Sequence, residues 1–560
     1  MLILGVSAYY HDSAACIIKD GQVMVAIEEE RFSKIKHDNN FPHKAIEFCL
    51  KSQKLKAEEI DCVAYYEKPL LKFERILETF LATWPFSLTP FLKGIPEWLD
   101  YKIKVEATIK KLGFKNKIFF IPHHFSHASA SFYPSPFEKA AILTVDGVGE
   151  YQTTGLWKGE GNNIKPLKLI NFPNSLGLLY STFTAFLGFK VNEDEYKLMG
   201  LAAYGKPKYN VSINQLIDTK DDGSFKLDLK YFGFRESFSM YNNRFEKIFG
   251  PARKPSEKIT KRHKDIAASI QKTTEEIYFK MLNHLYSITK TENLCLSGGV
   301  ALNALANGKI YQKTPFKKVY IFGAAGDSGA AVGAGLFVYN YVNPSSKRQL
   351  INSLCFGSSY TNNQIEPSLK KYKLKYKKLN EEKLINKTAQ LLSQGKIIGW
   401  FQGRCEFGPR ALGNRSILCK PNPRSMKTKM NIIKKREQFR PFAGSILRTK
   451  VSDYFEVPGK NLWSPFMTFC FQVKKDKKKD LAAIVHADGT CRIQTVNKVN
   501  GRYYLLIKKF YELTGIPCIL NTSFNLKGEP IVETPEQAVA DFLITKMDYL
   551  VIGDFLVSKP

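Results

Sequence analysis

Arginines recur in residues 402–416 and 434–447 of this chain, among glycines and aromatic residues. They are Arg404, Arg410, Arg415, Arg436 and Arg440. Glycines at 403, 408 and 413 and Pro409 interrupt the first stretch, which predicts a folded turn rather than a solvated basic run. Guanidinium groups bind phosphate or carboxylate through paired hydrogen bonds, and glycine lets the backbone approach a ligand closely. Phe407 and Phe439 indicate partial burial, so we favour an anion-binding site over a basic surface loop.

A second group of residues has the chemistry of a metal site. His123 and His127 are four residues apart, so on a helix both imidazoles project from one face. Asp146 follows the apolar run AAILTV, and Asp327 lies in GAAGDSG after KVYIF. Both positions predict the ends of parallel strands, where open α/β sheets bind ligands, and this ligand set favours Fe(II), Mn(II) or Zn over calcium. The alternatives are histidines that hydrogen-bond locally and aspartates that form turns beside glycine.

Two further motifs follow predicted strands. His11 and Asp12 come after the first strand, and His11 there can act as a general base, a role worth about 100- to 10,000-fold in rate. A capping or core histidine is at least as common. In SGGVALN, Gly298, Gly299 and Asn303 offer backbone N–H groups and a helix N-terminus to a nucleotide phosphate. The alternative is a tight turn.

The elements that must position these residues follow an α/β pattern. Apolar strands, glycine turns and helices alternate through the first 340 or so residues and indicate two halves. The hairpin AACIIKDGQVMVAIEEE turns at Lys19, Asp20 and Gly21. The sequence becomes polar and irregular between 341 and 361, so we expect domains at 1–345 and 346–560.

Composition narrows the function classes. The net charge of +31 permits anionic substrates, but no basic run is interleaved with stacking aromatics, so nucleic-acid binding is not favoured. Ten cysteines without a CxxC pair predict reduced thiols rather than disulfides or zinc modules. We expect no membrane span: the most apolar stretch, 80–99, carries three prolines, Lys93 and Glu97 and predicts an irregular helical excursion or a binding wall. The N-terminus lacks a basic signal-peptide region, and we expect a cytoplasmic protein.

Taken together, the motifs resemble those of the NodU/CmcH family of O-carbamoyltransferases, over nearly the whole chain. They are HDSAA at 11–15, HHFSHASASF at 123–132, LTVDGVGE, SLGLLYS, EYKLMGLAAYG, LSGGVALN, GDSGAAVGAG, the arginine-rich stretch, HADGTCRIQTV at 486–496 and ILNTSFNLKGEPIVETP from 519. The order and coverage of these motifs, rather than any one of them, carry the resemblance.

The resemblance implies a fold and a reaction. Residues 1–345 are expected to form an actin-like (ASKHA) domain of two βαβ-type halves, akin to threonylcarbamoyl transferases, and 346–560 a YrdC-like α/β domain. The C-terminal domain is expected to make carbamoyl-adenylate from carbamoyl phosphate and Mg-ATP. The N-terminal domain then transfers the carbamoyl group to a hydroxyl of a sugar or natural-product acceptor. A homodimer is the family expectation, and a tRNA-binding or tRNA-modifying protein is the alternative function.

The motifs described above and the resemblance together assign roles to residues. Fe(II) is the implied metal, and its ligands are His123, His127, Asp146 and Asp327. Catalytic roles fall to His11, Asp12, Arg410, Lys434 and Arg440. Binding of carbamoyl phosphate and of the nucleotide falls to Arg404, Arg415, Arg492, Gly298, Gly299, Asn303, Asn521, Thr522, Ser523 and Asn525.

Overall fold

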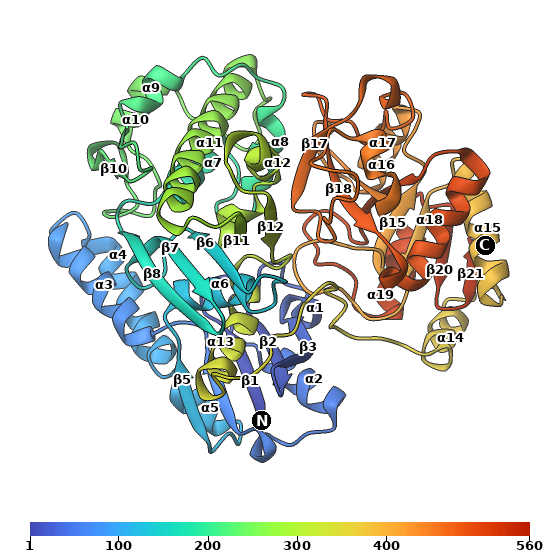
Figure 1. The fold of residues 1–560 in the computed structure, drawn as a ribbon, viewed down its shortest axis with the longest axis horizontal. Helices are drawn as coiled ribbons and strands as arrows, with labels where there is room; N and C mark the ends of the chain where they lie inside the picture. The colour runs from blue at the N-terminus through green and yellow to red at the C-terminus, as the bar shows by residue number, and fades with distance from the viewer. Residues whose placement is uncertain (560) are drawn as a thin grey trace. The chain divides into compact units, whose positions relative to one another are not determined.

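The computed structural model describes residues 1–559, which form two compact units (Figure 1). The N-terminal unit contains Met1–Val25 and Asn39–Leu350. The C-terminal unit contains Ala26–Asp38 and the described residues from Ile351 onward. Sequence reasoning assigned the whole of 1–345 to one domain, whereas the structure groups the 26–38 segment with the C-terminal unit.

The N-terminal unit contains the same five-stranded arrangement twice. In each sheet a meander of three consecutive strands is extended by two parallel strands, so the strand orders correspond one to one. The first sheet has the order β3 (Gln22–Glu28), β2 (Ala14–Lys19), β1 (Leu2–Ser7), β4 (Cys62–Tyr65), β5 (Lys117–Phe120). The second has the order β8 (Asn163–Asn171), β7 (Gln152–Glu160), β6 (Lys139–Val145), β11 (Asn293–Ser297), β12 (Lys318–Ile321). The predicted turn between β2 and β3 is confirmed, because Asp20 and Gly21 both have positive φ, 49° and 79°.

Two helices, α6 (His123–Phe132) and α13 (Asp327–Val342), pack on one another between these sheets (Figure 1). Helix α6 follows β5 of the first sheet but packs on β6 and β11 of the second. Helix α13 follows β12 of the second sheet but packs on β1 and β2 of the first. Their close approach requires glycine, since a Cβ at Gly333 would lie 1.9 Å from the carbonyl oxygen of Ser126. Each helix begins directly after a strand, so its first turn lies at the carboxyl edge of parallel strands.

The other helices of the N-terminal unit surround the sheets. They are α2 (His43–Gln53), α3 (Pro69–Ala82), α4 (Leu88–Glu97), α5 (Val105–Lys111), α7 (Leu176–Phe186), α8 (Glu195–Ala202), α9 (Asn210–Asn214), α10 (Asn243–Phe249), α11 (Lys261–Thr289) and α12 (Ala304–Lys313). A small two-stranded sheet joins β9 (Ile217–Thr219) and β10 (Phe225–Leu227). Within residues 1–559, no helix has the length and apolar character needed to cross a membrane.

The C-terminal unit is built on one mixed nine-stranded sheet. Its order is β13 (Lys375–Lys378), β21 (Phe555–Ser558), β20 (Tyr549–Ile552), β14 (Ile398–Phe401), β15 (Arg415–Cys419), β19 (Cys518–Ser523), β16 (Ala443–Leu447), β18 (Thr490–Val496), β17 (Phe469–Gln472). Its helices are α1 (Glu30–Ser33), α14 (Asn362–Lys371), α15 (Glu381–Ser393), α16 (Ser425–Ile433), α17 (Val451–Tyr454), α18 (Gly501–Thr514) and α19 (Pro535–Ile544). Helices α15 and α18 pack together over a core that includes Trp400, Tyr503 and Phe510.

Candidate functional site

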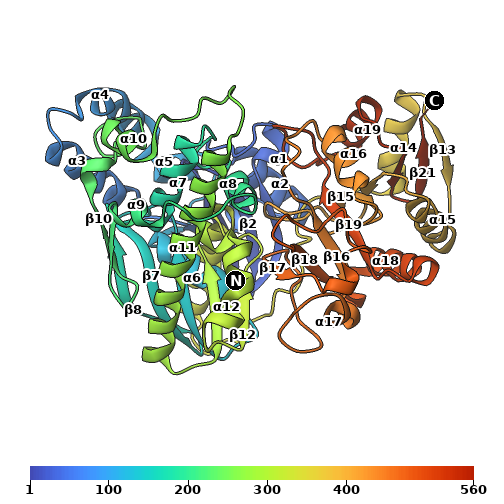
Figure 2. The same cartoon turned by 90° about the horizontal axis from the view of Figure 1, so that it is seen from above.

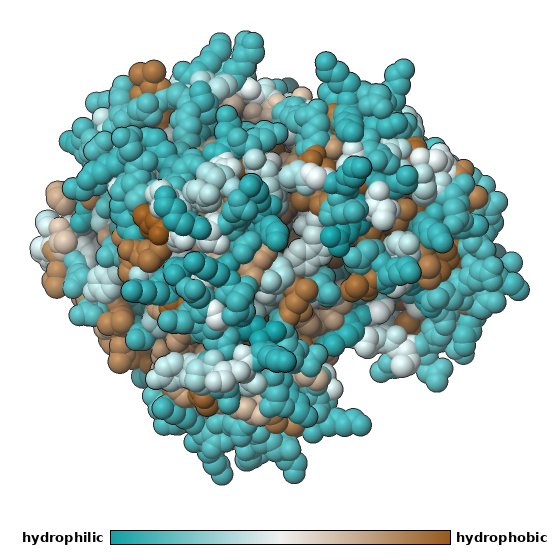
Figure 3. Space-filling view, viewed as in Figure 1, coloured by the Kyte–Doolittle hydropathy of each residue, from teal (hydrophilic) through white to brown (hydrophobic). Residues whose placement is uncertain are grey.

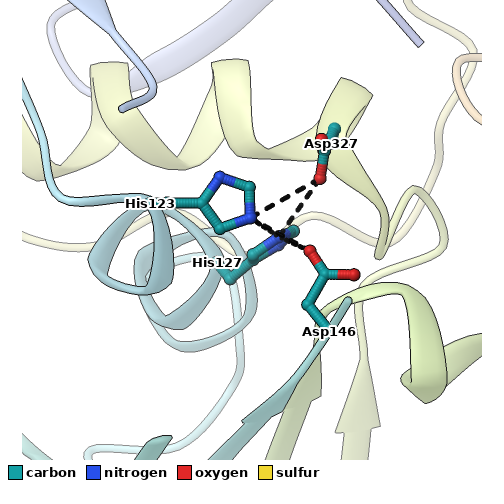
Figure 4. Close-up of side chains that lie close together, drawn as sticks. All are labelled: His123, His127, Asp146 and Asp327. Carbon is teal, nitrogen blue, oxygen red and sulfur yellow. Dashed lines mark hydrogen bonds and ion pairs between the residues drawn. The ribbon is translucent and has the colours of Figure 1, made fainter. Parts of the chain in front are cut away.

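Four side chains converge in the N-terminal unit in the way the sequence predicts for a metal centre (Figure 4). His123 and His127 project from the same face of α6, Asp146 follows β6, and Asp327 is the first residue of α13. The Nε2 atoms of the two histidines lie 3.1 Å apart, and Asp146 Oδ2 lies 3.0 Å and 3.2 Å from them. Asp327 Oδ1 lies 3.7 Å from His123 Nε2 and 3.4 Å from His127 Nε2. All four residues are buried.

The donor set fits a divalent metal ion. Neither carboxylate oxygen of Asp327 has a hydrogen-bond partner among the described residues, although the residue is fully buried. A buried carboxylate without such partners is costly unless a cation balances it. Burial lowers the pKa of His127, but its hydrogen bond to Asp146 and the nearby charges of Asp146 and Asp327 outweigh that effect and raise the pKa to about 9. The four residues could therefore hold a metal ion through two imidazole nitrogens and two carboxylate oxygens.

Neighbouring groups hold three of the four ligands. The Nδ1 atom of His127 lies 3.3 Å from Ser297 Oγ at the end of β11, and the backbone N–H of Gly299 donates to Asp146 Oδ1 at 3.2 Å. The carboxylate of Glu150 accepts from the backbone N–H of His123 at the start of α6. Such contacts fix the direction of metal ligands. The neighbouring His124 turns away from the group, with Nδ1 2.8 Å from Thr144 Oγ1.

His11 lies beside this group, as the sequence predicts, and is paired with Asp12. Its Nδ1 is 3.0 Å from Asp12 Oδ2, and its Nε2 is 4.0 Å from Asp327 Oδ2. Burial lowers the pKa of His11, but the charges of Asp327 and Asp12 and the bond to Asp12 raise it overall to about 10. An imidazolium cannot accept a proton, so a base role requires a cation near Asp146 and Asp327 that reduces this pull.

The glycine motif after β11 makes internal contacts. The N–H of Gly298 donates to the carbonyl oxygen of Ala325 at 2.8 Å, and that of Gly299 to Asp146. Asn303 caps α12, because its Oδ1 accepts from the N–H of Ala306, and it also bonds Gln271. These groups thus shape the edge of the metal centre, and their phosphate-binding role stays a prediction.

In the C-terminal unit, the loop 403–414 is held by carboxylates that sequence reasoning missed. Glu406 Oε1 accepts the backbone N–H groups of Leu412, Asn414 and Arg415, at 2.7, 2.7 and 3.2 Å. The peptide groups of Gly408 are held by the 26–38 segment: Glu28 Oε1 accepts its N–H, and Arg31 Nη2 donates to its carbonyl oxygen at 2.9 Å. The only sequence signal for Glu406 is that it is the single acidic residue in 402–416.

Two of the predicted anion-binding arginines build this loop. Arg415 is fully buried, and its Nη atoms donate to the carbonyl oxygens of Gln402, Gly403, Asn414 and Ser358. Its guanidinium also stacks on Phe401, 3.7 Å from the ring centre. Arg404 donates to the carbonyl oxygens of Gly357 and Phe356. Arg410 is half-buried and lies between Gly408 and Leu412, whose backbone groups are held by the hydrogen bonds described above.

Other predicted cations gather beside this loop. Arg440 is close enough to both Lys434 and Arg492 to lower the pKa of each, together with burial, which is the larger cause. The Nε atom of Arg492 is buried without a hydrogen-bond partner among the described residues. Excess buried positive charge of this kind is typical of an anion-binding site.

Amide side chains border the same group. Asn521 Nδ2 donates to the carbonyl oxygen of Ala411 at 3.3 Å and to Ser445 Oγ at 3.1 Å, which ties the loop to β19 and β16. Lys434 Nζ donates to the carbonyl oxygens of Ser523 and Asn525 at 2.5 and 2.8 Å and to Asn525 Oδ1 at 2.6 Å. Thr522 pairs with Ile417 in the sheet. The structure therefore brings Lys434, Arg440, Arg492 and Asn521 to one region, and Lys434 also fixes the turn after β19.

These observations define a class: an α/β protein with a duplicated sheet and a buried His/Asp group in its N-terminal unit, and a cationic region in its C-terminal unit. Comparison with known families places the chain within this class. Residues 2–336 match the carbamoyltransferase N-terminus family, and residues 389–559 match the carbamoyltransferase C-terminus family. The chain belongs to the NodU/NolO carbamoyltransferase family of enzymes.

Individual relatives agree with this assignment. The chain is similar to an uncharacterized protein of Synechocystis, with 45% identity over 100% of this chain and 96% of the relative. It is also similar to nodulation protein NolNO of Sinorhizobium fredii, with 37% identity over 99% of this chain and 80% of that protein. Among solved structures, component A of the (R)-2-hydroxyglutaryl-CoA dehydratase of Acidaminococcus fermentans matches 61% of this chain and 99% of its own, with 14% identity and a TM-score of 0.34.

Proposed function

We propose that the protein is an ATP-dependent O-carbamoyltransferase that activates its donor in the C-terminal unit and transfers the carbamoyl group in the N-terminal unit. The observation that carries the proposal is the buried His123, His127, Asp146 and Asp327 group in a chain of the carbamoyltransferase family. The proposal includes an actin-like (ASKHA) fold for the N-terminal unit, supported by its duplicated sheet, and a YrdC-like fold for the C-terminal unit.

In the first step, water attacks the phosphorus of carbamoyl phosphate, so that inorganic phosphate leaves, and the carbamate that remains is joined to the α-phosphate of ATP. A carbamate oxygen attacks phosphorus, the bond to the β-phosphate oxygen breaks, and pyrophosphate leaves with carbamoyl-adenylate formed. Arg410, Arg440, Arg492 and Lys434 balance the charge of these mutually repelling anions, which supports placing this step in the C-terminal unit. Glu406 supports the same step indirectly, because it fixes the loop that carries Arg410.

The second step transfers the carbamoyl group to an alcohol of a sugar or natural product. The acceptor oxygen attacks the carbonyl carbon, the carbon–oxygen bond to the phosphate breaks, and AMP leaves. A metal ion held by the two histidines and two aspartates, with Fe(II) as our choice, would stabilise the charge on the departing phosphate. His11 is positioned to take the hydroxyl proton at Nε2, because Asp12 holds its other ring nitrogen.

Labelled pyrophosphate tests the first step. With carbamoyl phosphate and ATP present, the protein should exchange label from pyrophosphate into ATP. Arg410→Ala should abolish exchange, whereas Arg424→Ala, which removes an exposed arginine of the same unit, should leave it within about twofold. Absence of exchange under every metal condition tried would refute the proposed chemistry.

Substitution of a metal ligand tests whether the two steps take place at two separate sites. His127→Ala should retain exchange but lose bound iron, measured by metal analysis, and lose carbamoyl transfer. His284→Ala, a histidine of α11 outside the metal group, is the control and should keep both. If His127→Ala lost exchange as completely as Arg410→Ala does, the assignment of the two steps to two sites would be wrong.

A further inference from the structure

Exposed hydrophobic side chains are concentrated on one small part of the N-terminal unit. Nine of the 23 exposed large hydrophobic residues among those described lie between Leu70 and Tyr101, a stretch of only 32 residues. This stretch forms α3, α4 and the helical turn that follows. In both views these helices lie at the outer edge of their unit, and Figure 3 shows hydrophobic residues gathered over them at the left of the view (Figures 1–3). Scattered exposed leucines are ordinary, but a group of this density marks an interaction surface.

Helix α3 is oriented against the usual pattern of burial. Its buried residues are Pro69, Lys72 and Arg75, while Leu70, Leu71 and Leu81 are exposed. Lys72 pairs inside the protein with Glu67 at 2.6 Å, and Arg75 stacks on Phe172 at 4.8 Å. Helix α4 has no buried residue at all. Folding of this chain alone therefore leaves these three leucines of α3, and Leu88 and Leu92 of α4, in water, which is unfavourable unless another surface covers them.

Several of these exposed residues lie at one apex, where α3 ends and α4 begins. We define the apex patch as Leu81, Trp84, Phe86, Leu88, Leu92 and Phe238. Leu81 and Phe86 are each 75% exposed, and Trp84 is 56% exposed. Phe238 joins from another loop, with Lys93 Nζ 5.4 Å from its ring centre.

The apex is a built structure rather than a loose loop. Phe80 and Phe91 pack edge to face beneath it, with ring centres 5.6 Å apart. Ser87 Oγ donates to the carbonyl oxygen of Phe80 at 2.7 Å, and Thr83 Oγ1 to that of Thr79 at 2.7 Å. Thr83 and Ser87 therefore form hydrogen bonds within the protein, and the outward surface of the turn is aromatic and aliphatic.

Charge around the apex identifies the kind of partner. No acidic residue occurs between Glu78 and Glu97, and Lys93 is the one charged residue in that interval. The chain as a whole carries +31, so a second copy would meet like charge, whereas an anionic surface would be attracted. Tryptophan and phenylalanine at an apex with nearby lysine are typical of segments that enter the headgroup region of a bilayer.

We propose that the apex patch docks the enzyme on the surface of an anionic phospholipid bilayer, with Trp84 and Phe86 inserted at the level of the headgroups. The apolar side chains enter the acyl boundary, and Lys93 faces the lipid phosphates. The protein remains on one side of the bilayer, as expected where the described helices cannot span it. The docking surface consists of residues with no role in the two proposed reaction steps.

Vesicle sedimentation tests the proposal with the full chain. The protein should sediment with vesicles of phosphatidylcholine mixed with phosphatidylglycerol and bind vesicles of phosphatidylcholine alone more weakly. The double variant Trp84→Ser, Phe86→Ser should lower the partition coefficient on the anionic vesicles about tenfold or more. Trp84 fluorescence should shift to shorter wavelength on binding, measured against a Trp84→Phe variant that reports the other tryptophans.

A matched control distinguishes binding through the apex patch from non-specific hydrophobic adsorption to the vesicles. Val499→Ser, Ile544→Ser removes two exposed hydrophobic residues of the C-terminal unit and should bind as the wild type does. Pyrophosphate exchange should be unchanged in both double variants, which shows that they are folded. Equal sedimentation of the wild type and the apex variant would overturn the proposal. So would a fall in molecular mass of the apex variant in solution without lipid, because that result would make the patch an interface between copies.

Discussion

Individual cations in the C-terminal unit divide into those that build the site and those that bear on a ligand. The Nη atoms of Arg415 donate hydrogen bonds to four carbonyl oxygens, and Arg415 therefore stabilises the loop 403–414. Nε is buried without a partner among the described residues in both Arg415 and Arg492, but Arg492 lies close to Arg440, whose charge adds to burial in lowering the pKa of Arg492. We therefore expect substitution of Arg415 to lower stability first, and substitution of Arg492 to weaken anion binding first.

Asp541 provides a pH-dependent test at the same scale. This carboxyl on α19 is buried with Oδ2 unpartnered, and burial, helped by Glu529, raises its pKa to about 7 against the opposing charge of Lys434. The pKa of the Asp541 carboxyl is higher in the folded than in the unfolded protein. Its contribution to the free energy of unfolding is therefore greatest below about pH 4 and is lost as pH rises through about 7. Asp541→Asn should remove this loss, so the variant should gain up to about 4 kcal/mol relative to wild type between pH 4 and 8.

Denaturant unfolding across that pH range measures the difference. Glu512→Gln, at an exposed position of α18, is the control, and its profile should run parallel to the wild type. Parallel profiles for Asp541→Asn as well would show that the carboxyl titrates at its ordinary pKa in the folded protein.

At the scale of elements, the metal centre depends on how closely α6 and α13 approach. The histidines belong to one helix and Asp327 to the other, so the helix–helix distance sets the ligand geometry. Gly333 permits that distance, since a Cβ there would lie 1.9 Å from the carbonyl oxygen of Ser126 and 2.8 Å from the backbone nitrogen of Ala130.

Gly333→Ala should therefore move α6 away from Asp327. We expect a loss of about 1–3 kcal/mol in the free energy of unfolding and a clear fall in bound iron. Gly335→Ala in the same helix is the matched control, because its Cβ would come too close only to Cδ1 of Ile18, the end of a flexible side chain, at 2.5 Å, and would meet the next atoms at 3.6 and 3.7 Å. Metal analysis of both purified variants decides the matter, and equal iron content would contradict the proposed role of the helix contact.

At the scale of the whole molecule, the C-terminal unit is not continuous in sequence. The 26–38 segment begins within β3 of the first sheet, yet its Glu28 accepts the backbone N–H of buried Gly408 and its Arg31 donates to the carbonyl oxygen of Gly408. The backbone N–H of Ala26 also donates to the carbonyl oxygen of Phe356 at 3.4 Å. Cutting the chain at the apparent boundary near 350 would therefore remove part of the second unit.

A fragment that begins at residue 351 should show this dependence. Without the 26–38 segment two polar groups of Gly408 lose their partners, at about 1–3 kcal/mol each, and the fragment should unfold more easily and lack pyrophosphate exchange. Fusing residues 26–38 to it through a flexible linker should restore stability, measured by thermal unfolding. The same fusion with Arg31→Met should restore much less. Full stability of the bare fragment would contradict the structural role of the segment.

Local patterns explain which features could be predicted. The spacing of His123 and His127 places them on one helical face because a helix repeats every 3.6 residues, and α6 confirms this. The position of Asp146 after a strand is equally local, and the structure confirms it. Glu406, Glu28 and Arg31 escaped prediction because their importance lies in the backbone groups they hold, up to 380 residues away in sequence.

The sequence by itself determined the α/β class, the carbamoyltransferase family and the identity of the four candidate metal ligands. It could do so because strand-end carboxylates and helical spacing are set by short-range geometry. Only the tertiary structure decided that Arg415 serves the loop, that the 26–38 segment belongs with the C-terminal unit and that α3 exposes its leucines. Those outcomes depend on which groups, distant in sequence, satisfy buried hydrogen bonds, and on which apolar faces are covered by other elements. A local sequence pattern contains neither kind of information.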